Sequence, residues 1–251
     1  MKTEIYVATH KKYQMPTDNI YVPIHVGKAN NDLDFGYIGD DTNNNISHKN
    51  SEYCELTALY WLWKNSQADI VGLVHYRRYF ALSNNQVIMT EKSISDIFKI
   101  NPDIIIAPKK KNYYIENIYN HYKNAHHIQD LINTRSVVEK NYPEYLSSFD
   151  DVMSSKKLRL YNMFIMPKAT SDLYCEWLFN ILFEVEKKSD VANYSNYQKR
   201  LYGFLSERLF NVWIEKNHIN IMEINVFNTE KENKVNKMLN YAKRKIFKCK
   251  L

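Results

Sequence analysis

The sequence predicts an α/β fold in which a mostly parallel sheet has helices on both faces. Short apolar runs rich in β-branched residues alternate with longer segments of helical periodicity, which is typical of such sheets. The chain has 251 residues, 45% of them hydrophobic and 25% charged, an ordinary globular composition. No internal repeat or linker interrupts the pattern. One domain is therefore expected over residues 1–227, followed by a distinct tail at 228–251.

The predicted strands are short apolar runs bounded by polar or turn-forming residues. The second run ends at Gly27 and the fourth stops at Pro108, residues that favour turns and interrupt strands. In chain order the strands are expected at 4–8, 20–26, 70–74, 103–108, 160–166 and 219–226.

Helices are predicted where apolar residues recur at intervals of three and four. Asn50 or Ser51 can cap the first helix and Thr90 the second, because their side-chain oxygens accept hydrogen bonds from free backbone N–H groups. In chain order the helices are expected at 51–65, 91–100, 115–132, 136–142, 171–188 and 197–216. Residues 28–50 are rich in turn-forming residues and are expected to form a long ordered loop, which is often functional.

Several classes of protein are not expected. The five glycines cannot build a Rossmann or a P-loop fingerprint. Cys54, Cys175 and Cys249 have neither zinc-site nor disulfide spacing, which favours a reducing cytosol. The N-terminus lacks the apolar core of a signal peptide, and no apolar run is long enough to span a bilayer. The net charge of +6 suits anionic partners. Nucleic acid is not expected, because no basic stripe is interleaved with aromatic residues.

The tail has the pattern of a basic amphipathic helix. Such a helix is typical of an element that lies on an anionic membrane surface, and a solvated helix packed on the domain is the alternative. The apolar stripe consists of Val235, Met238, Leu239, Ala242 and Ile246, and the surrounding basic residues are Lys234, Lys237, Lys243, Arg244, Lys245, Lys248 and Lys250.

Four polar side chains follow the apolar strand at 70–74, and ligands of open α/β sheets bind at the carboxyl ends of strands. Two of them are arginines, which bind phosphate oxygens in a planar, bidentate way. The segment therefore predicts a site for an anionic ligand such as a diphosphate. The alternative is a structural ion-pair cluster with Asp40 or Asp41. The four residues are His75, Tyr76, Arg77 and Arg78.

Further polar residues stand in the loop before the first helix. Asp40, Asp41 and Asn50 can bind sugar hydroxyls or a ribose, although such residues are also ordinary in turns and caps. A D-x-D sequence occurs at Asp32 and Asp34, but it lies in a polar turn and no second carboxylate cluster completes a metal cage. No metal site is assigned, and none is assigned to the histidines His121, His126 and His127.

Two helical carboxylates, Glu55 and Glu207, have large apolar neighbours. A buried carboxylate must be paired or have a raised pKa, and either state suits a general base. An ion pair of Glu207 with Arg208 or Arg200 is the structural alternative.

Five segments together resemble a bacterial family first catalogued as a domain of unknown function in capsule and O-antigen loci. The resemblance runs from about residue 4 to residue 226. It implies a glycosyltransferase, and some members of the family are treated as galactofuranosyltransferases. The segments are NISHKNSEYCELTALYW at 45–61, GLVHYRRYF at 72–80, YNMFIMPK at 161–168, YCEWLFNILFEVEKK at 174–188 and YQKRLYGFLSERLFNVWI at 197–214.

A second similarity is to GT-A-type transferases, in which the strand at 70–74 would lead to the metal-binding D-x-D motif. Here His75, Tyr76 and Arg77 stand at that position, so dependence on Mn²⁺ or Mg²⁺ is in doubt and no cofactor is assigned. The resemblance implies that Arg77 and Arg78 balance the diphosphate of a nucleotide sugar. The full donor-binding set expected is Thr9, His10, Lys11, Asp40, Asp41, Asn50, His75, Tyr76, Arg77, Arg78 and Asn162, and the catalytic candidates are Glu207 and Glu55.

The resulting interpretation is a GT-A-like glycosyltransferase that moves a hexose from a UDP-sugar, with galactofuranose as one candidate. The expected acceptor is a polyprenyl-diphosphate-linked glycan in capsular polysaccharide or O-antigen synthesis. The protein would be cytoplasmic and peripheral on the inner face of the membrane, held there by its tail. The alternative is a non-catalytic protein of the same pathway that binds nucleotide sugars or glycans and needs no general base.

Overall fold

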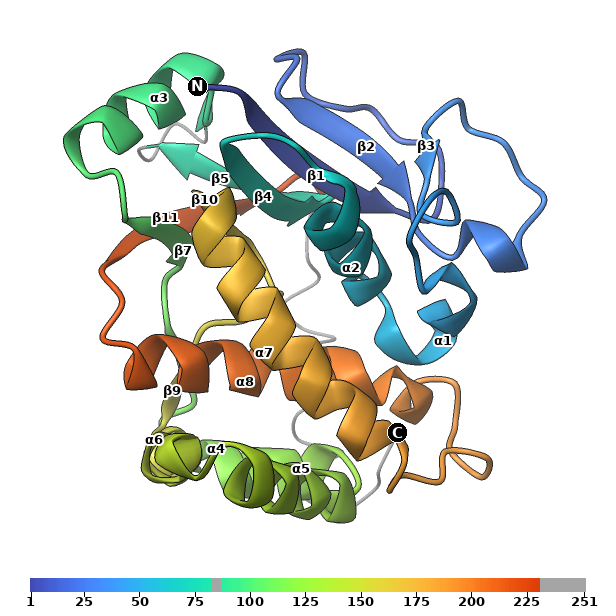
Figure 1. Ribbon diagram of the computed structural model, residues 1–251, viewed down its shortest axis with the longest axis vertical. Coiled ribbons are helices and arrows are strands. Elements are labelled where there is room, and N and C mark those ends of the chain that lie inside the picture. The colour runs from blue at the N-terminus through green and yellow to red at the C-terminus, as the bar shows by residue number, and fades with distance from the viewer. Residues whose placement is uncertain (83–86, 231–251) are drawn as a thin grey trace.

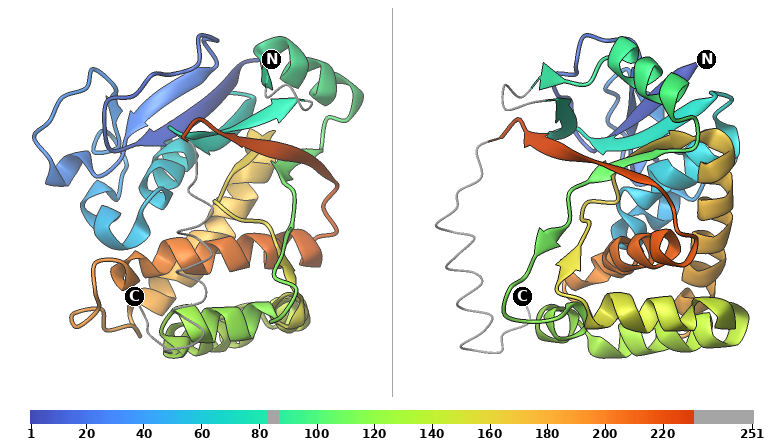
Figure 2. Two further views of the ribbon diagram at one scale, coloured as in Figure 1. Left: turned by 180° about the vertical axis from the view of Figure 1, so that it is seen from behind. Right: turned by 90° about the vertical axis from the view of Figure 1, so that its left-hand side faces the viewer.

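A computed structural model describes residues 1–82 and 87–230 (Figure 1). Within these residues the main sheet has nine strands in the order β3-β2-β1-β4-β10-β7-β11-β5-β6, and β8 pairs with β9 in a separate ribbon. Figure 2 shows this ribbon standing below the main sheet. The strands are β1 (Thr3–Thr9), β2 (Tyr21–His25), β3 (Ile38–Gly39), β4 (Ile70–His75), β5 (Arg78–Leu82), β6 (Val87–Ile88), β7 (Ile105–Pro108), β8 (Lys111–Asn112), β9 (Lys157–Leu158), β10 (Phe164–Pro167) and β11 (Ile221–Asn228).

The helices lie on both faces of the sheet, as expected. The α-helices are α1 (Asn50–Tyr53), α2 (Leu56–Asn65), α3 (Glu91–Ile100), α4 (Ile118–Ala125), α5 (Ile128–Asn141), α6 (Leu146–Ser154), α7 (Lys168–Glu186) and α8 (Leu201–Lys216). Short 3₁₀ turns are η1 (Lys28–Asn30), η2 (Ser47–Lys49), η3 (Pro143–Tyr145) and η4 (Gln198–Arg200). No helix among the described residues is long and apolar enough to cross a membrane.

The prediction of a mostly parallel sheet is wrong. Among the described strands of the main sheet, β1 is parallel to β2 and β4, β2 to β3, and β7 to β11, whereas the other five pairings are antiparallel. One cause is the Tyr76–Arg77 turn, because a two-residue connection joins only antiparallel strands. Another is β10, which enters between β4 and β7 in the opposite direction.

The hydrophobic core consists of two clusters, and the side chains of β1 point alternately into one and the other. Tyr6 and Ala8 join the larger cluster, which includes residues of α2, α7 and α8, whereas Ile5 and Val7 join a second cluster that includes residues of α3. In Figure 1, α4, α5 and α6 lie beyond α8, away from the sheet. Close packing also explains Gly72, because a Cβ atom there would lie 2.9 Å from the carbonyl oxygen of Phe164 in β10.

Most of the predicted helical segments are helical, but several helices begin or end at other residues than predicted. The helix at 91–100 is confirmed with its Thr90 cap, whose Oγ1 accepts from the Ser93 N–H. The single helix expected at 115–132 is wrong, because the extended backbone of His126 separates α4 from α5. Helix α6 was not predicted. The tail at 228–251 lies outside the described residues from position 231 onward.

Candidate active site

A pocket of about 630 Å³ opens at the carboxyl ends of β1 and β4, beside the α1–α2 junction and the start of α8. Eight residues predicted from the sequence line it. They are His10, Asn50, Glu55, His75, Tyr76, Arg77, Arg78 and Glu207. Eight further residues were not predicted, namely Ala8, Val26, Ser51, Cys54, Tyr161, Asn196, Lys199 and Arg200.

The β4–β5 hairpin presents the polar segment to the pocket. His75 pairs with Arg78 across the turn, and the Tyr79 hydroxyl donates to the carbonyl of Tyr76 at 3.0 Å. Nε2 of His75 lies 2.7 Å from the carbonyl oxygen of Tyr161. Because a carbonyl only accepts, the proton of a neutral His75 must be on Nε2. Burial lowers the pKa of His75, which favours the neutral ring at neutral pH.

The two arginines of the hairpin have different surroundings. Nη1 of Arg77 lies 3.1 Å from Oε2 of Glu230, and Nζ of Lys11 lies 3.6 Å from Oε1 of the same carboxylate. The guanidinium of Arg78 instead lies over the ring of Tyr161, 4.6 Å from its centroid. The partner of Arg77 is therefore Glu230. The structural alternative, an ion pair with Asp40 or Asp41, is wrong for this arginine.

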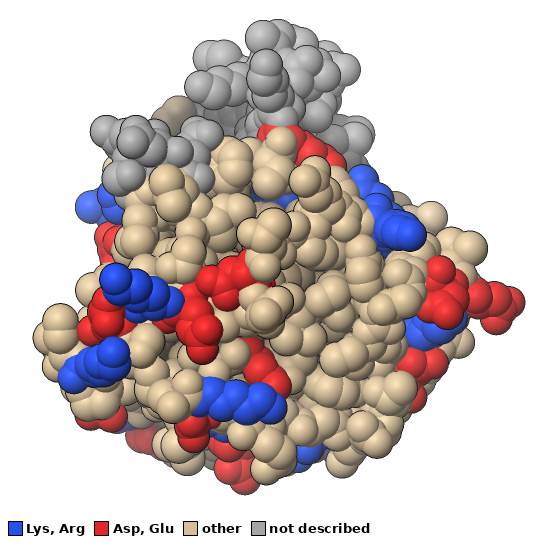
Figure 3. All heavy atoms as spheres, turned by 90° about the horizontal axis from the view of Figure 1, so that it is seen from above, with Lys and Arg blue, Asp and Glu red and all other residues tan. Residues whose placement is uncertain are grey.

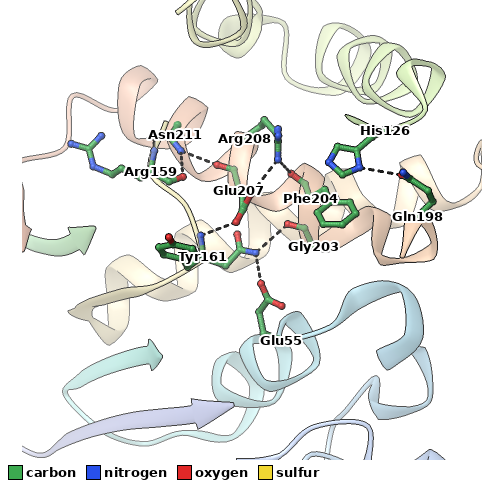
Figure 4. A network of polar contacts seen from close by, with 11 residues as sticks. Glu55, His126, Arg159, Tyr161, Gln198, Gly203, Phe204, Glu207, Arg208 and Asn211 are labelled. Atoms are coloured by element: carbon green, nitrogen blue, oxygen red, sulfur yellow. Dashed lines mark hydrogen bonds and ion pairs between the residues drawn. The ribbon is translucent and has the colours of Figure 1, made fainter. Parts of the chain in front are cut away.

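A strained turn before β10 joins the hairpin to both catalytic candidates, and Figure 4 shows its contacts with Glu207 and Glu55. Tyr161 and Asn162 have φ angles of 79° and 51°, in the left-handed region that residues other than glycine seldom adopt. The N–H of Tyr161 donates to Oε1 of Glu207 at 2.8 Å. Nδ2 of Asn162 donates to Oε1 of Glu55 at 2.8 Å and to the carbonyl of Gly203 at 3.1 Å. One turn thus fixes the positions of two carboxylates and His75.

Glu207 is held in a mostly buried position on α8. Its Oε2 lies 3.2 Å from Nη1 of Arg208, which also donates to the carbonyl of Phe204 at 2.8 Å. Burial raises the pKa of Glu207, while Arg208 and the N–H of Tyr161 oppose the change. The ion pair with Arg208, given above as the structural alternative to a catalytic role, is therefore present, and it coexists with a raised pKa of Glu207.

Glu55 lies where the chain breaks between α1 and α2. Cys54 has a φ of 53°, which ends α1, and Glu55 is the N-cap residue of α2. Nε of Arg200 lies 3.2 Å from Sγ of Cys54, so Arg200 belongs to the same corner of the pocket. Cys54, Tyr161 and Arg200 lie within the quoted segments, but none was predicted to line the site, because their places depend on how the turns and helix ends fold.

Five predicted donor-binding residues do not line the pocket. The buried carboxylate of Asp40 accepts from the N–H groups of Gly27 and Lys28 and from the hydroxyl of Ser47, so it anchors its own loop. Thr9 is buried and bonds to the backbone of Lys11, Asp41 is exposed, and Asn162 donates to Glu55. Those outside the lining are Thr9, Lys11, Asp40, Asp41 and Asn162.

Metal-binding groups are sparse around the pocket. Asp32 and Asp34 are exposed in a loop, and Oδ1 of Asp34 accepts from the N–H of Gly36. Within residues 1–82 and 87–230, no three His, Cys, Asp or Glu side chains are grouped closely enough to hold an ion.

Comparison with known proteins gives one solved structure and one family. The chain is similar to the apo structure of WbbM, a bifunctional glycosyltransferase, with 34% identity and a TM-score of 0.83. The match covers 92% of this chain and 46% of that one, so the chain spans about half the length of WbbM. No curated protein matches the chain. The model of a domain of unknown function, DUF4422, matches residues 4–218, and the chain belongs to this family.

Proposed function

We propose that the protein is a glycosyltransferase that takes a hexose from a UDP-sugar. The observation that carries the proposal is the composition of the pocket, which combines cationic side chains suited to a diphosphate with two carboxylates suited to acid–base chemistry. The cations are Arg77, Arg78, Lys199 and Arg200, and the carboxylates are Glu55 and Glu207. The similarity to a bifunctional glycosyltransferase supports the same chemistry.

A GT-A-like arrangement is supported by the position of the pocket. The pocket lies at the carboxyl ends of parallel β1 and β4, where nucleotide ligands of open sheets bind. In this arrangement Arg77 and Arg78 bind the diphosphate. Their fixed positive charges stabilise the negative charge that develops on the leaving UDP.

Glu207 is the proposed general base. A carboxylate with a raised pKa is a better proton acceptor from an acceptor hydroxyl than an exposed one. Glu55 is the second candidate, since Asn162 occupies only its Oε1 among the contacts within the described chain. Neutral His75 supports the turn through its hydrogen bond to the carbonyl of Tyr161.

The proposed pathway is capsular polysaccharide or O-antigen synthesis, with a polyprenyl-diphosphate-linked glycan as acceptor and galactofuranose as one candidate sugar. The tail from residue 231 onward would hold the protein on the anionic inner face of the membrane, and no nucleic acid or required metal ion is proposed. The alternative of a non-catalytic binding protein predicts the same ligand without turnover.

A donor screen tests the proposal directly. Purified protein is incubated with a panel of nucleotide sugars and a synthetic lipid-linked acceptor, and product is detected by mass spectrometry. We expect a mass increase of one hexose with a UDP donor. Binding of UDP-sugars without product or UDP release across the panel would favour the non-catalytic alternative. Failure to bind any UDP-sugar would contradict both.

A further inference from the structure

A second surface with a distinct chemistry lies on the segment after β7 and on the β8–β9 ribbon. We call it the Tyr114 surface, made of residues 109–119 with Lys156 and Lys157. Three large side chains are exposed on it: Tyr114 is 76% exposed, Ile115 64% and Tyr119 38%. Several exposed apolar groups in one short segment are unusual for a soluble surface and indicate an interaction site.

The backbone holds Tyr114 outward rather than leaving it in a loose loop. Its φ is 56°, a conformation that costs free energy for an aromatic residue. Its N–H donates to Oδ1 of Asn112 at 2.8 Å, and its carbonyl accepts from Nζ of Lys156 at 3.2 Å. The N–H of Ile115 donates to the carbonyl of Tyr113 at 2.6 Å. These bonds fix the tip of the segment in an ordered, exposed form.

Lysines surround the apolar tip. In the β8–β9 ribbon Asn112 pairs with Lys157, which brings the two basic runs side by side. The pKa of Lys110 is lowered, first by burial and then by the charges of Arg159 and Lys157, while Glu215 and Glu223 oppose the change. Acidic groups are also near. Glu223 pairs with Arg159, whereas Glu116 accepts a hydrogen bond from the neutral amide of Asn124 and keeps its negative charge, so the lysines outnumber the free carboxylate. The lysines are Lys109, Lys110, Lys111, Lys156 and Lys157.

One residue of this surface lies within electrostatic range of the pocket. Tyr113, the residue before the exposed tip, is half-buried, and burial raises its pKa to about 12. Glu207 and Tyr161 are among the groups close enough to influence it. The exposed tip is therefore one residue along the chain from a side chain that lies within electrostatic range of the proposed base.

We propose that the Tyr114 surface docks on an anionic phospholipid bilayer. Tyrosine and an aliphatic side chain at the tip enter the interface, and the lysines contact the headgroup phosphates. The inference deepens the proposed function, since a lipid-borne acceptor would then be presented beside the pocket. It assigns membrane contact to the folded domain, independently of residues 231–251.

Vesicle binding by the full chain tests this without donor or acceptor, so its failure is separate from any failure of turnover. Co-sedimentation is measured with equimolar phosphatidylglycerol and phosphatidylcholine vesicles and with pure phosphatidylcholine vesicles. The test variants are the pair Tyr114→Ser with Ile115→Ser, and the pair Lys156→Glu with Lys157→Glu. Each pair is expected to lower the partition coefficient for anionic vesicles at least about tenfold, or about 1.4 kcal/mol.

Helix α3 offers matched controls. Ile100 is 77% exposed there, and Lys92 and Lys99 are exposed lysines. The upper face of Figure 1, which carries α3, has charges of both signs interspersed (Figure 3). Ile100→Ser, and Lys92→Glu with Lys99→Glu, should leave vesicle binding unchanged.

Hydrogen exchange on the unaltered chain gives a readout that needs no variant to fold. Anionic vesicles should slow exchange of the amides in 112–119 and leave those of α3 unaffected. The proposal is overturned if wild-type protein does not bind anionic vesicles, or if it binds with no protection of 112–119. Binding that both pairs of substitutions leave unchanged would assign the membrane contact to another part of the chain.

Discussion

Nη1 of Arg77 lies 3.1 Å from Oε2 of Glu230, at the edge of the pocket that the proposed donor would occupy. Lys11 approaches the other oxygen of the same carboxylate. All three side chains are more than one-third exposed. Exposed ion pairs contribute only about 0–1 kcal/mol to stability, so an incoming diphosphate can displace this carboxylate at small cost.

The first prediction is that the hairpin arginines bind the diphosphate. Arg77→Ala and Arg78→Ala should each weaken UDP binding by about 1.5–3 kcal/mol, roughly 10- to 150-fold, because each removes a hydrogen bond to a charged group. Isothermal titration calorimetry with UDP measures this. Arg135→Ala is the matched control, since Arg135 pairs with Asp150 away from the pocket. Unchanged UDP affinity in both test variants would remove the diphosphate role.

The second prediction concerns the competing carboxylate. Glu230→Gln should strengthen UDP binding by up to about fivefold, because the diphosphate no longer has to displace a carboxylate from Arg77 and Lys11. The gain should shrink at high salt, which screens exposed charges. A weaker UDP affinity in Glu230→Gln would mean that Glu230 helps to hold the ligand.

Much of the fold could be predicted, because the signals were local. The apolar run at 70–74 and the Thr90 cap specify β4 and α3 without reference to the rest of the chain. Strand direction is not local. The chain turns back after Tyr76, yet the sequence HYRRYF shows no turn-forming glycine, proline or asparagine, so an antiparallel hairpin was not expected.

The site was predicted in part for a similar reason. Arg77, Arg78 and Glu207 are conspicuous as charges among apolar residues, and they do line the pocket. Asp40 is equally polar in the sequence, but its carboxylate is buried and accepts hydrogen bonds from the backbone of its own loop. Tyr161 contacts His75 and Glu207 through its backbone carbonyl and N–H, and the identity of its side chain does not predict these contacts.

The third prediction is that turnover does not require a bound divalent cation. Among the described residues, no three potential metal ligands lie close enough together to hold an ion. Cationic side chains line the pocket and can bind the diphosphate instead. Product formation should therefore persist, at least in part, in EDTA. Complete loss on chelation, with recovery on adding Mn²⁺, would show that a metal site exists, and Asp32 and Asp34 would be tested first.

The fourth prediction links stability to pH through Glu207. Its folded-state pKa is raised above the ordinary value of 4.5, so the folded protein binds this proton more tightly than the unfolded chain. The stabilisation is complete below pH 4.5 and is lost as pH rises through the folded-state value. Glu207→Gln cannot lose a proton. The Tm of wild type relative to this variant should therefore fall between about pH 4 and neutral pH. An opposite slope would mean that the pairing with Arg208 outweighs burial.

The last prediction is kinetic. If Glu207 removes the proton of the acceptor hydroxyl, Glu207→Gln should lower kcat by about 10²–10⁴-fold and leave UDP affinity near that of wild type. The amide keeps the size of the side chain and can still accept from the N–H of Tyr161, so the turn that holds His75 is preserved. Both changes remove the counter-charge of Arg208, but alanine would also remove the hydrogen-bond acceptor and leave a cavity, which would confound chemistry with packing. Glu215→Gln, an exposed change on the same helix, is the control and should retain full turnover. Wild-type turnover in Glu207→Gln would exclude it as the base, and Glu55→Gln would then be expected to show the loss.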